Sequence, residues 1–358
     1  MKDFVESLQP FFGKWYLGPR IGQGTYGSIY SIHHDESGIR LHAAMKVIKV
    51  PKSESAIDEL RVQGFTDEEM EEYFEKQVQF VTGEINIMNR FRGHDNIVCY
   101  EDHAVVRVPG KMEWYILIRM ERLERLEDYF KRVNANCLQV VQLWYDIASA
   151  LVDCHGSGVI HRDIKPENVL VSKDGFYKLV DFGISRYLSD DFATTMAGTY
   201  PYMAPEVYQH KAYDHRADIY SLGIMIYQML NAGRIPFLPP YPKAITATDK
   251  DEAVYSRFGG KQIPPIPGVP QRIMRVLLKC VAFNQEDRYP NAEALVRDIQ
   301  AISLTPQEEQ MPLYDEKGYP MPMKANRRWI GKTSVLIALA ALAALYGTAM
   351  LIFYLIKH

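Results

Sequence analysis

Cysteine is scarce in this chain of 358 residues, and the few cysteines present form no pattern. The four lie far apart and include no Cys-x-x-Cys pair (Cys99, Cys137, Cys154 and Cys280). Disulfide frameworks and zinc sites need closely patterned cysteines, so this spacing argues against both. We therefore expect the folded part to lie in a reducing compartment, with its cysteines as small core residues.

A basic charge excess is also missing. The formal net charge is −3, which provides no electrostatic footprint for nucleic acid. The first six residues include charged side chains and lack the apolar core of a secretory signal. Hydrophobic residues make up 47% of the chain, an ordinary share for a globular protein. We expect a folded protein without a nucleic acid partner.

Charged side chains are absent from Thr333 to Ile356. As a helix this stretch would be about 36 Å long, enough to cross a hydrocarbon core of ~30 Å. A buried core helix is the alternative, although core helices seldom run so far without a charge. The residues before the stretch are basic (Lys324, Arg327, Arg328 and Lys332). This flank predicts a single-pass membrane protein whose preceding part is cytoplasmic.

Small residues recur four apart in the same stretch, at Ala340/Ala344 and Ala343/Gly347. Such spacing pairs helices in membranes, but it also arises by chance in alanine-rich sequence. A homodimer is therefore one of two open interpretations.

The chemistry-bearing part of the sequence is a polar loop between apolar runs. Asp163, Lys165 and Asn168 lie in this loop, and Asp181 ends a later apolar run. Such a cluster beside buried runs is costly unless it does chemistry. Its spacing is that of a phosphoryl-transfer site, with a carboxylate to orient a hydroxyl and an Asn/Asp pair to hold a metal.

A second signal is the Gly22-x-Gly24-x-x-Gly27 pattern near the N-terminus. This pattern also occurs in dinucleotide sites, where a helix follows the glycines. Here apolar alternation resumes at Ile29, which indicates a strand hairpin instead. Glycines allow a backbone to close over phosphates without a side-chain clash.

Together, His161-Arg162-Asp163-Ile164-Lys165-Pro166-Glu167-Asn168 and Asp181-Phe182-Gly183 make the chain resemble eukaryotic-like Ser/Thr protein kinases. The resemblance covers about residues 15–303 and is similar in style to bacterial membrane-anchored members. It implies ATP and Mg²⁺, with Mn²⁺ as an alternative metal, and protein substrates. By resemblance Asp163 and Lys165 are catalytic, Asn168 and Asp181 hold the metal, and Lys165 favours Ser/Thr over tyrosine substrates.

The resemblance also assigns the nucleotide site. Lys46 would reach the α/β-phosphates, and Glu84 would be its acidic partner, with Glu75 as a competitor. Met120 would control access behind adenine, while Glu121 and Leu123 would offer backbone groups to its edge. The remaining implied contacts are Ile21, Gly22, Gly24, Gly27, Ile29 and Ala44.

The segment between Lys46 and Glu84 is about twice as long as the family spacing leads us to expect. Thr66 and Glu69 predict a capping box, and apolar residues recur at helical spacing from Met70 to Met88. We expect a short helix, a turn at Gly64 and a long helix ending near Phe91. A solvated face is the simpler role for this acidic insert, and a regulatory or dimer role is the alternative.

Regulation is implied around the segment from Asp181 to Glu206. Thr194 and Thr195 are candidate phosphorylation sites, Arg162 would pair with a phosphate there, and Thr199 resembles the threonine that steadies the catalytic Asp and Lys. Plain exposed threonines are the alternative. If the predicted helix pairs, trans-autophosphorylation follows as a hypothesis.

We therefore predict an α+β, bilobal kinase-like fold. The expected parts are a leader (1–14), a catalytic domain (15–303, with lobes 15–121 and 122–303), a juxtamembrane linker (304–328) and a membrane segment with its tail (329–358). The predicted function is a membrane-tethered protein Ser/Thr kinase, at a bacterial plasma membrane. A membrane-anchored pseudokinase scaffold is the alternative, although such a scaffold would normally have lost a catalytic residue.

Overall fold

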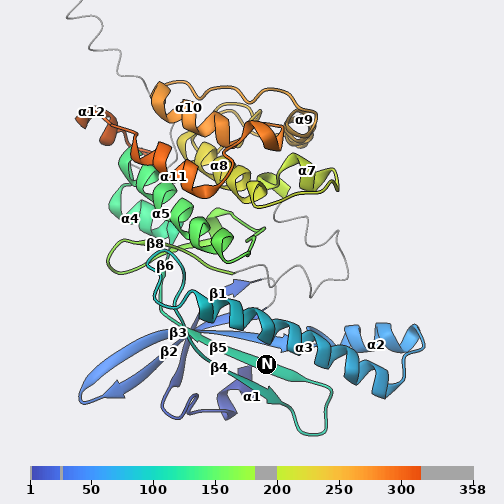
Figure 1. Cartoon of the computed structure of the whole chain (residues 1–358). Coiled ribbons are helices and arrows are strands. Elements are labelled where there is room, and N and C mark those ends of the chain that lie inside the picture. Colours follow the sequence, from blue (N-terminus) through green and yellow to red (C-terminus); the bar gives the residue numbers. More distant parts are fainter. Residues whose placement is uncertain (1, 25–26, 182–199, 316–358) are drawn as a thin grey trace, which may run out of the picture.

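The small lobe is built on an antiparallel sheet of five strands with the order β1-β2-β3-β5-β4 (Figure 1). The computed structural model describes residues 2–24, 27–181 and 200–315. The strands are β1 Tyr16–Gly24, β2 Gly27–Glu36, β3 Ile39–Val50, β4 Tyr100–Arg107 and β5 Trp114–Met120. The hairpin predicted after the glycine-rich stretch is β2–β3, in which Ile29 lies opposite Lys46.

From Ala43 on, strand β3 is buried on both faces, which explains the apolar sequence of this part. Ala43, Met45 and Val47 belong to one core cluster, whereas Ile48 and Val50 belong to the main core. Because successive side chains alternate between faces, Ala44 and Lys46 lie on the same face as Ile48.

The insert forms the two predicted helices, α2 Glu54–Val62 and α3 Asp67–Arg90. The capping box is confirmed, since the Thr66 side chain accepts from the Glu69 backbone N–H and the Glu69 carboxylate accepts from that of Thr66. Helix α3 lies along the sheet, and α2 lies at its far end (Figure 1). Gly64 has a φ of 92° and makes the turn between them, a conformation that glycine adopts readily.

Residues 2–14 belong to the small lobe rather than preceding it. They include helix α1 Lys2–Ser7 and pack on the outer face of the sheet. Val5 is fully buried, and Phe11 and Trp15 are almost so, in a cluster that includes Tyr115 of β5. The expected separate leader is thus part of the core, because these apolar side chains cover a sheet face that would otherwise be exposed.

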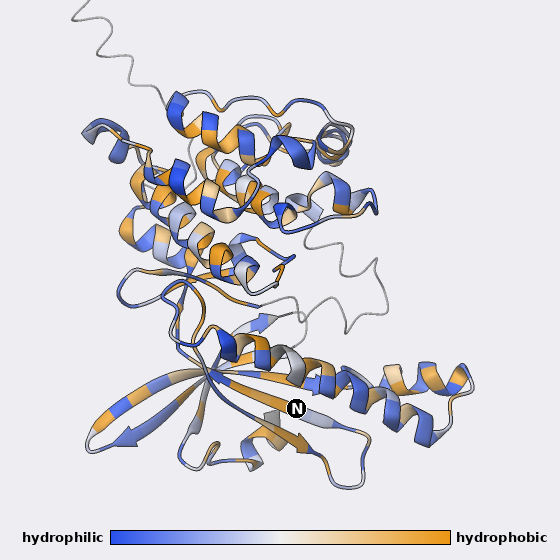
Figure 2. Cartoon of the chain, in the orientation of Figure 1, coloured by the Kyte–Doolittle hydropathy of each residue, from blue (hydrophilic) through white to orange (hydrophobic). Residues whose placement is uncertain are grey.

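The large lobe is mainly helical. Its helices are α4 Leu126–Val133, α5 Cys137–Gly156, α7 Pro205–Tyr208, α8 Arg216–Leu230, α9 Ala247–Phe258, α10 Gln271–Cys280, α11 Ala292–Gln300 and α12 Pro306–Glu309. Figure 2 shows hydrophobic residues gathered on the inward sides of these helices. Helix α8 packs against both α5 and α10, and most of its residues are buried.

A small three-stranded sheet joins the lobes and carries the polar loop. It consists of β6 Glu124–Arg125, β7 Val169–Val171 and β8 Tyr177–Leu179. The loop with Asp163 and Lys165 precedes β7, and Asp181 follows β8. The topology therefore brings the two predicted halves of the site to one end of this sheet.

The large lobe continues past the predicted boundary at residue 303. The Leu313 N–H donates to the Ala135 carbonyl at 3.0 Å, and the Cys137 N–H donates to the Met311 carbonyl at 2.9 Å. Leu313 is also buried in the main core. Residues up to 313 therefore complete the lobe rather than form a free linker.

Among the residues described by the structure, no helix combines the length and apolar character needed to cross a bilayer. The predicted membrane segment, residues 333–356, lies outside that part of the chain.

Candidate active site

Asp163 lies at the centre of a short-range polar network. The Lys165 ammonium is 2.8 Å from Asp163 Oδ2, and the Asn168 amide nitrogen donates to the same oxygen at 2.7 Å. Asn168 Nδ2 also donates to the Asp163 carbonyl at 2.8 Å. Asn168 lies in a single turn of 3-10 helix, Pro166–Asn168, and is buried. The loop backbone thus holds three predicted site residues together.

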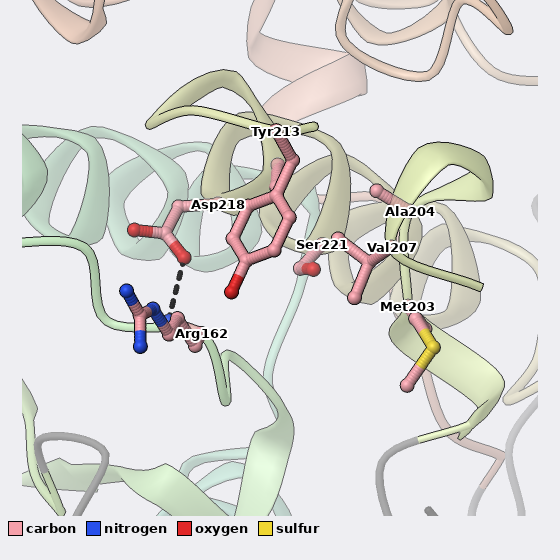
Figure 3. A pocket seen from close by; sticks show the side chains of 8 residues that line it. Arg162, Met203, Ala204, Val207, Tyr213, Asp218 and Ser221 are labelled. Atoms are coloured by element: carbon pink, nitrogen blue, oxygen red, sulfur yellow. Dashed lines mark hydrogen bonds between the residues drawn. The ribbon is translucent and has the colours of Figure 1, made fainter. Parts of the chain in front are cut away.

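Asp218 braces this loop from below. Its Oδ2 accepts from the His161 N–H and its Oδ1 from the Arg162 N–H, both at 2.8 Å, and His155 Nε2 lies 3.0 Å from Oδ2. Figure 3 shows Asp218 directed at Arg162 beside the ring of Tyr213, around a small cavity of about 10 Å³. Asp218 therefore acts as a buried brace for the loop backbone.

The charge of Asp218 is stabilised despite its complete burial. Burial alone would raise the pKa of this carboxyl group, but the hydrogen bond from His155, the nearby histidines and the Arg162 N–H together lower the pKa below its ordinary value. The ionised form accepts both loop N–H groups, so the brace depends on it.

Two site residues have unusual backbone conformations. Arg162 has a φ of 67° and Asp181 a φ of 58°. Positive φ is uncommon outside glycine and costs energy, and it clusters at functional sites. Both residues flank the polar network, which is consistent with a backbone shaped for function.

Lys46 meets Asp181 across the two lobes. Its ammonium lies 2.5 Å from Asp181 Oδ1, and its side chain is 5% exposed against 38% for that of Asp181. A buried ammonium needs such a partner. The contact brings β3 of the small lobe to the end of β8, as the resemblance implies for a nucleotide site between the lobes.

The glycine-rich stretch spans the end of β1 and the start of β2. A Cβ on Gly27 would lie 2.2 Å from the Val47 carbonyl oxygen, so only glycine fits there, whereas one on Gly22 would make ordinary contact with Ile29. Ile21 is partly exposed, and Gly24 ends β1. Residues 25–26 lie outside the described part of the chain.

The predicted adenine-edge residues follow β5. Ala44 is buried and pairs with Met120 in the sheet. The Glu121 N–H donates to the Cys99 carbonyl at 3.2 Å, so the Glu121 carbonyl remains as its backbone group for a ligand. Leu123 packs at the edge of the main core. Met120, Glu121 and Leu123 therefore lie where the chain passes from the small lobe to the large lobe.

Other predicted residues are not described. Glu84 lies in α3, but its side chain is outside the described part of the structure, so its pairing with Lys46 stays a prediction. Thr194, Thr195 and Thr199 fall in 182–199, which is also outside it.

The donor set fits a hard divalent cation. Because Asn168 uses its amide nitrogen toward Asp163, its Oδ1 is the atom available to a metal. Asp181 uses Oδ1 toward Lys46, which leaves Oδ2. One amide oxygen and one carboxylate suit Mg²⁺, which keeps several waters or phosphate oxygens as further ligands.

The large lobe also holds an ion pair between Glu206 and Arg288. Two parallel hydrogen bonds of 2.7 Å join the buried side chains. Such bidentate geometry fixes orientation as well as charge. The pair anchors α7 to the segment before α11.

Two buried cations, Lys178 and Arg257, were not predicted from the sequence. Lys178 of β8 lies 2.9 Å from Glu121 Oε1, and Arg257 of α9 donates to the carbonyls of Tyr200 and Pro201. Lys178 lies between the apolar Tyr177 and Leu179, and alternation along a strand places such a lysine on the opposite face, so the sequence indicates exposure rather than burial. Nothing in the polar sequence around Arg257 indicates burial.

Most of the sequence matches a known protein family. The protein kinase domain model matches residues 15–298. The chain is 30% identical over 297 residues to a probable serine/threonine-protein kinase PknB of Bifidobacterium longum, covering 80% of this chain and 39% of that protein. It is 29% identical over 300 residues to the serine/threonine-protein kinase PknH of Mycobacterium tuberculosis, covering 82% and 42%.

A eukaryotic relative is similar at a lower level. The Aurora kinase of Saccharomyces cerevisiae is 27% identical over 273 residues, covering 76% of this chain and 65% of that protein. The chain spans about two-fifths of the length of the two bacterial relatives. With the domain match covering most of the chain and both lobes in place, the chain belongs to the protein kinase family.

Proposed function

We propose that the chain is an ATP-dependent protein Ser/Thr kinase. One observation carries the proposal: the Asp163–Lys165–Asn168 network and the Lys46–Asp181 pair lie at the same end of the joining sheet. Every catalytic residue type that the family uses is retained in these positions. The alternative of a pseudokinase scaffold has no such observation in its favour.

Asp163 would orient the substrate hydroxyl and accept its proton. Its carboxylate is held by Asn168 and Lys165, which fixes the direction in which it faces the incoming group. Lys165 would neutralise the charge of the γ-phosphoryl group during transfer. Phosphoryl transfer depends on such alignment and charge neutralisation rather than on covalent catalysis.

Lys46 would bind the α/β-phosphates of ATP, with Glu84 as its acidic partner. Its ammonium is buried and already lies at Asp181, so the phosphates would enter beside an oriented cation. Asn168 and Asp181 would hold Mg²⁺, which supplies charge neutralisation to the phosphates when bound. The backbone from Gly22 to Gly27 would cover them.

Two observations support Ser/Thr rather than tyrosine substrates. Lys165 lies beside Asp163, the arrangement that the resemblance connects with Ser/Thr chemistry. Both bacterial relatives are named serine/threonine-protein kinases.

We also propose Thr194 and Thr195 as phosphorylation sites and Thr199 as a residue that steadies Asp163 and Lys165.

The phosphate of such a site would need a cation, and Arg162 is the proposed partner. Its guanidinium carbon lies 5.8 Å from the centre of the Tyr213 ring, next to the catalytic loop. Pairing there would order the segment through a charge-assisted contact.

Membrane attachment through residues 333–356 is a further part of the proposal. It is supported by the uncharged length of the stretch and its basic flank. Removing residues 329–358 should release the protein from a membrane fraction, and it should lower autophosphorylation at dilute concentration if the helices pair. Retention in the membrane fraction would refute the attachment, and unchanged autophosphorylation would refute the pairing.

The test of activity is transfer of labelled γ-phosphate to matched peptides that contain only serine, only threonine or only tyrosine. We expect incorporation into the serine and threonine peptides, with none for an Asp181→Ala variant. Labelling of the tyrosine peptide alone would contradict the substrate class. Equal labelling by wild type and variant would contradict the proposed site.

A further inference from the structure

A second cavity lies in the large lobe, away from the catalytic loop. Its volume is about 250 Å³, and residues of α8, α9, α10 and the loops after α9 and α10 line it. An apolar cavity of ~150 Å³ is already large enough to hold benzene. This cavity is therefore large enough for a small organic molecule.

Two buried polar atoms of residues that line it have no hydrogen-bond partner among the described residues. They are the hydroxyl of Tyr220 and the Nε of Arg257. The two residues are 1% and 2% exposed. Buried polar groups almost always find a partner, so two orphaned donors around one cavity indicate a missing acceptor.

The charges of the lining residues also favour a negatively charged acceptor. Arg257 uses its two terminal nitrogens on the backbone carbonyls of Tyr200 and Pro201, and no described carboxylate pairs with it. Lys261 is a second cation on the lining, which includes no acidic residue. Burial lowers the pKa of Arg257, as expected for a guanidinium that lacks an anionic partner.

The remaining lining is apolar, with Ile263, Leu278, Val281 and Phe283 among its residues. We propose that this cavity binds a small organic anion, with a carboxylate or phosphate group at Tyr220, Arg257 and Lys261 and a compact apolar body against these side chains. Both donor atoms are closed off from solvent, so the anionic oxygens would accept from the Tyr220 hydroxyl and from Arg257 Nε after these side chains shift toward the cavity. Lys261 adds charge without a fixed hydrogen bond.

An anion bound in the cavity would also affect the turn that begins at Tyr200. Arg257 joins the cavity to the carbonyls of Tyr200 and Pro201, at the start of the 3-10 turn Tyr200–Tyr202. An anion at Nε neutralises this guanidinium and fixes its orientation. Binding therefore steadies the turn, which lies directly after residues 182–199.

The test uses the full chain titrated with benzoate, phenyl phosphate and neutral benzyl alcohol, followed by calorimetry. We expect saturable binding of at least one anion and none of the alcohol in the same range. Preference between benzoate and phenyl phosphate identifies the carboxylate or the phosphate as the recognised group. Absence of saturable binding for both anions would overturn the site.

Matched variants test whether the anion binds in this cavity. Tyr220→Phe removes only the orphaned hydroxyl, and we expect it to weaken anion binding about tenfold, the scale of one hydrogen bond to a charged group. Lys261→Gln should weaken it as well. The controls are Tyr227→Phe and Lys250→Gln. The Tyr227 hydroxyl donates to the Pro264 carbonyl, and Lys250 lies on α9. Equal affinity in all four variants would overturn the assignment to this cavity.

Amide hydrogen exchange tests the connection to the turn. The bound anion should slow exchange across residues 200–204 in the wild type, and less so in Tyr220→Phe at the same probe concentration. Saturable binding with unchanged exchange in this stretch would refute the connection. Because neither binding nor exchange depends on phosphoryl transfer, these outcomes are separate from a failure of the proposed activity.

Discussion

Asp218 is a fully buried carboxylate whose oxygens accept the two loop N–H groups of His161 and Arg162. Its lowered pKa means that the folded state favours the charged form more than the unfolded chain does. The stability that it adds is therefore present above the unfolded value, about 3.9, and is lost as the pH falls through the lower folded value.

We predict that Asp218→Asn flattens the acid side of the stability profile. Urea unfolding of wild type and variant, measured from neutral pH down to about pH 3, should show a smaller loss for the variant below about pH 4. The variant should also be less stable at neutral pH, because an amide cannot accept from both N–H groups and keep the His155 contact. Parallel profiles would contradict the role given to this carboxylate.

Glu206 and Arg288 form a buried ion pair, and burial raises the cost of removing either partner. Removing one partner leaves a buried charge without compensation, so Glu206→Gln should cost about 3–5 kcal/mol of unfolding free energy. Arg132, which pairs with Glu124 at the exposed end of α4, is the control. Arg132→Met should cost no more than about 1 kcal/mol. Equal losses by chemical unfolding would show that burial does not determine the cost.

At the scale of elements, the β2–β3 hairpin depends on one glycine. A side chain on Gly27 would meet the backbone of Val47, which cannot move without disturbing the register of β3. Gly83, inside α3, has open space where its Cβ would lie. The same substitution therefore has opposite consequences in the two elements.

We predict that Gly27→Ala lowers the melting temperature and weakens ATP binding. Gly83→Ala should stabilise the protein by up to about 1 kcal/mol, because alanine favours the helix. Differential scanning calorimetry without nucleotide compares the two, and an ATP titration follows. A neutral Gly27→Ala would refute the clash, and a destabilising Gly83→Ala would refute the open space.

Local signals allowed some elements to be predicted and hid others. The start of α3 was predictable because the Thr66–Glu69 capping box lies within four residues. The burial of Phe11 was not, because it depends on Tyr115, which is distant in the sequence. The fold beyond Ser303 was missed for the same reason, since Leu313 is fixed by Ala135 on another element.

The candidate site shows the same division. Asp163, Lys165 and Asn168 could be predicted together because they lie in one loop. Their resemblance to a known family also predicted Lys46 and Asp181, which physical reasoning from local sequence would not have paired. The burial of Arg257 was not predicted because a charged residue on a polar helix is normally solvated. Tertiary packing buries this one.

At the scale of the whole molecule, the proposed catalytic centre lies between the two lobes. Lys46 comes from the small lobe, and Asp163, Asn168 and Asp181 come from the loops around the joining sheet. Neither lobe contains the site alone. A change that leaves both lobes folded but alters Asp163 should therefore remove the chemistry and retain nucleotide binding.

The most direct measurement compares wild type with Asp163→Asn in transfer of labelled γ-phosphate from ATP to a serine or threonine peptide. Loss of the general base should lower kcat by about 10²–10⁴-fold, while the Kd for ATP and the melting temperature stay close to wild type. That result would confirm Asp163 as the catalytic carboxylate. Unchanged kcat in a folded, ATP-binding variant would contradict the central claim.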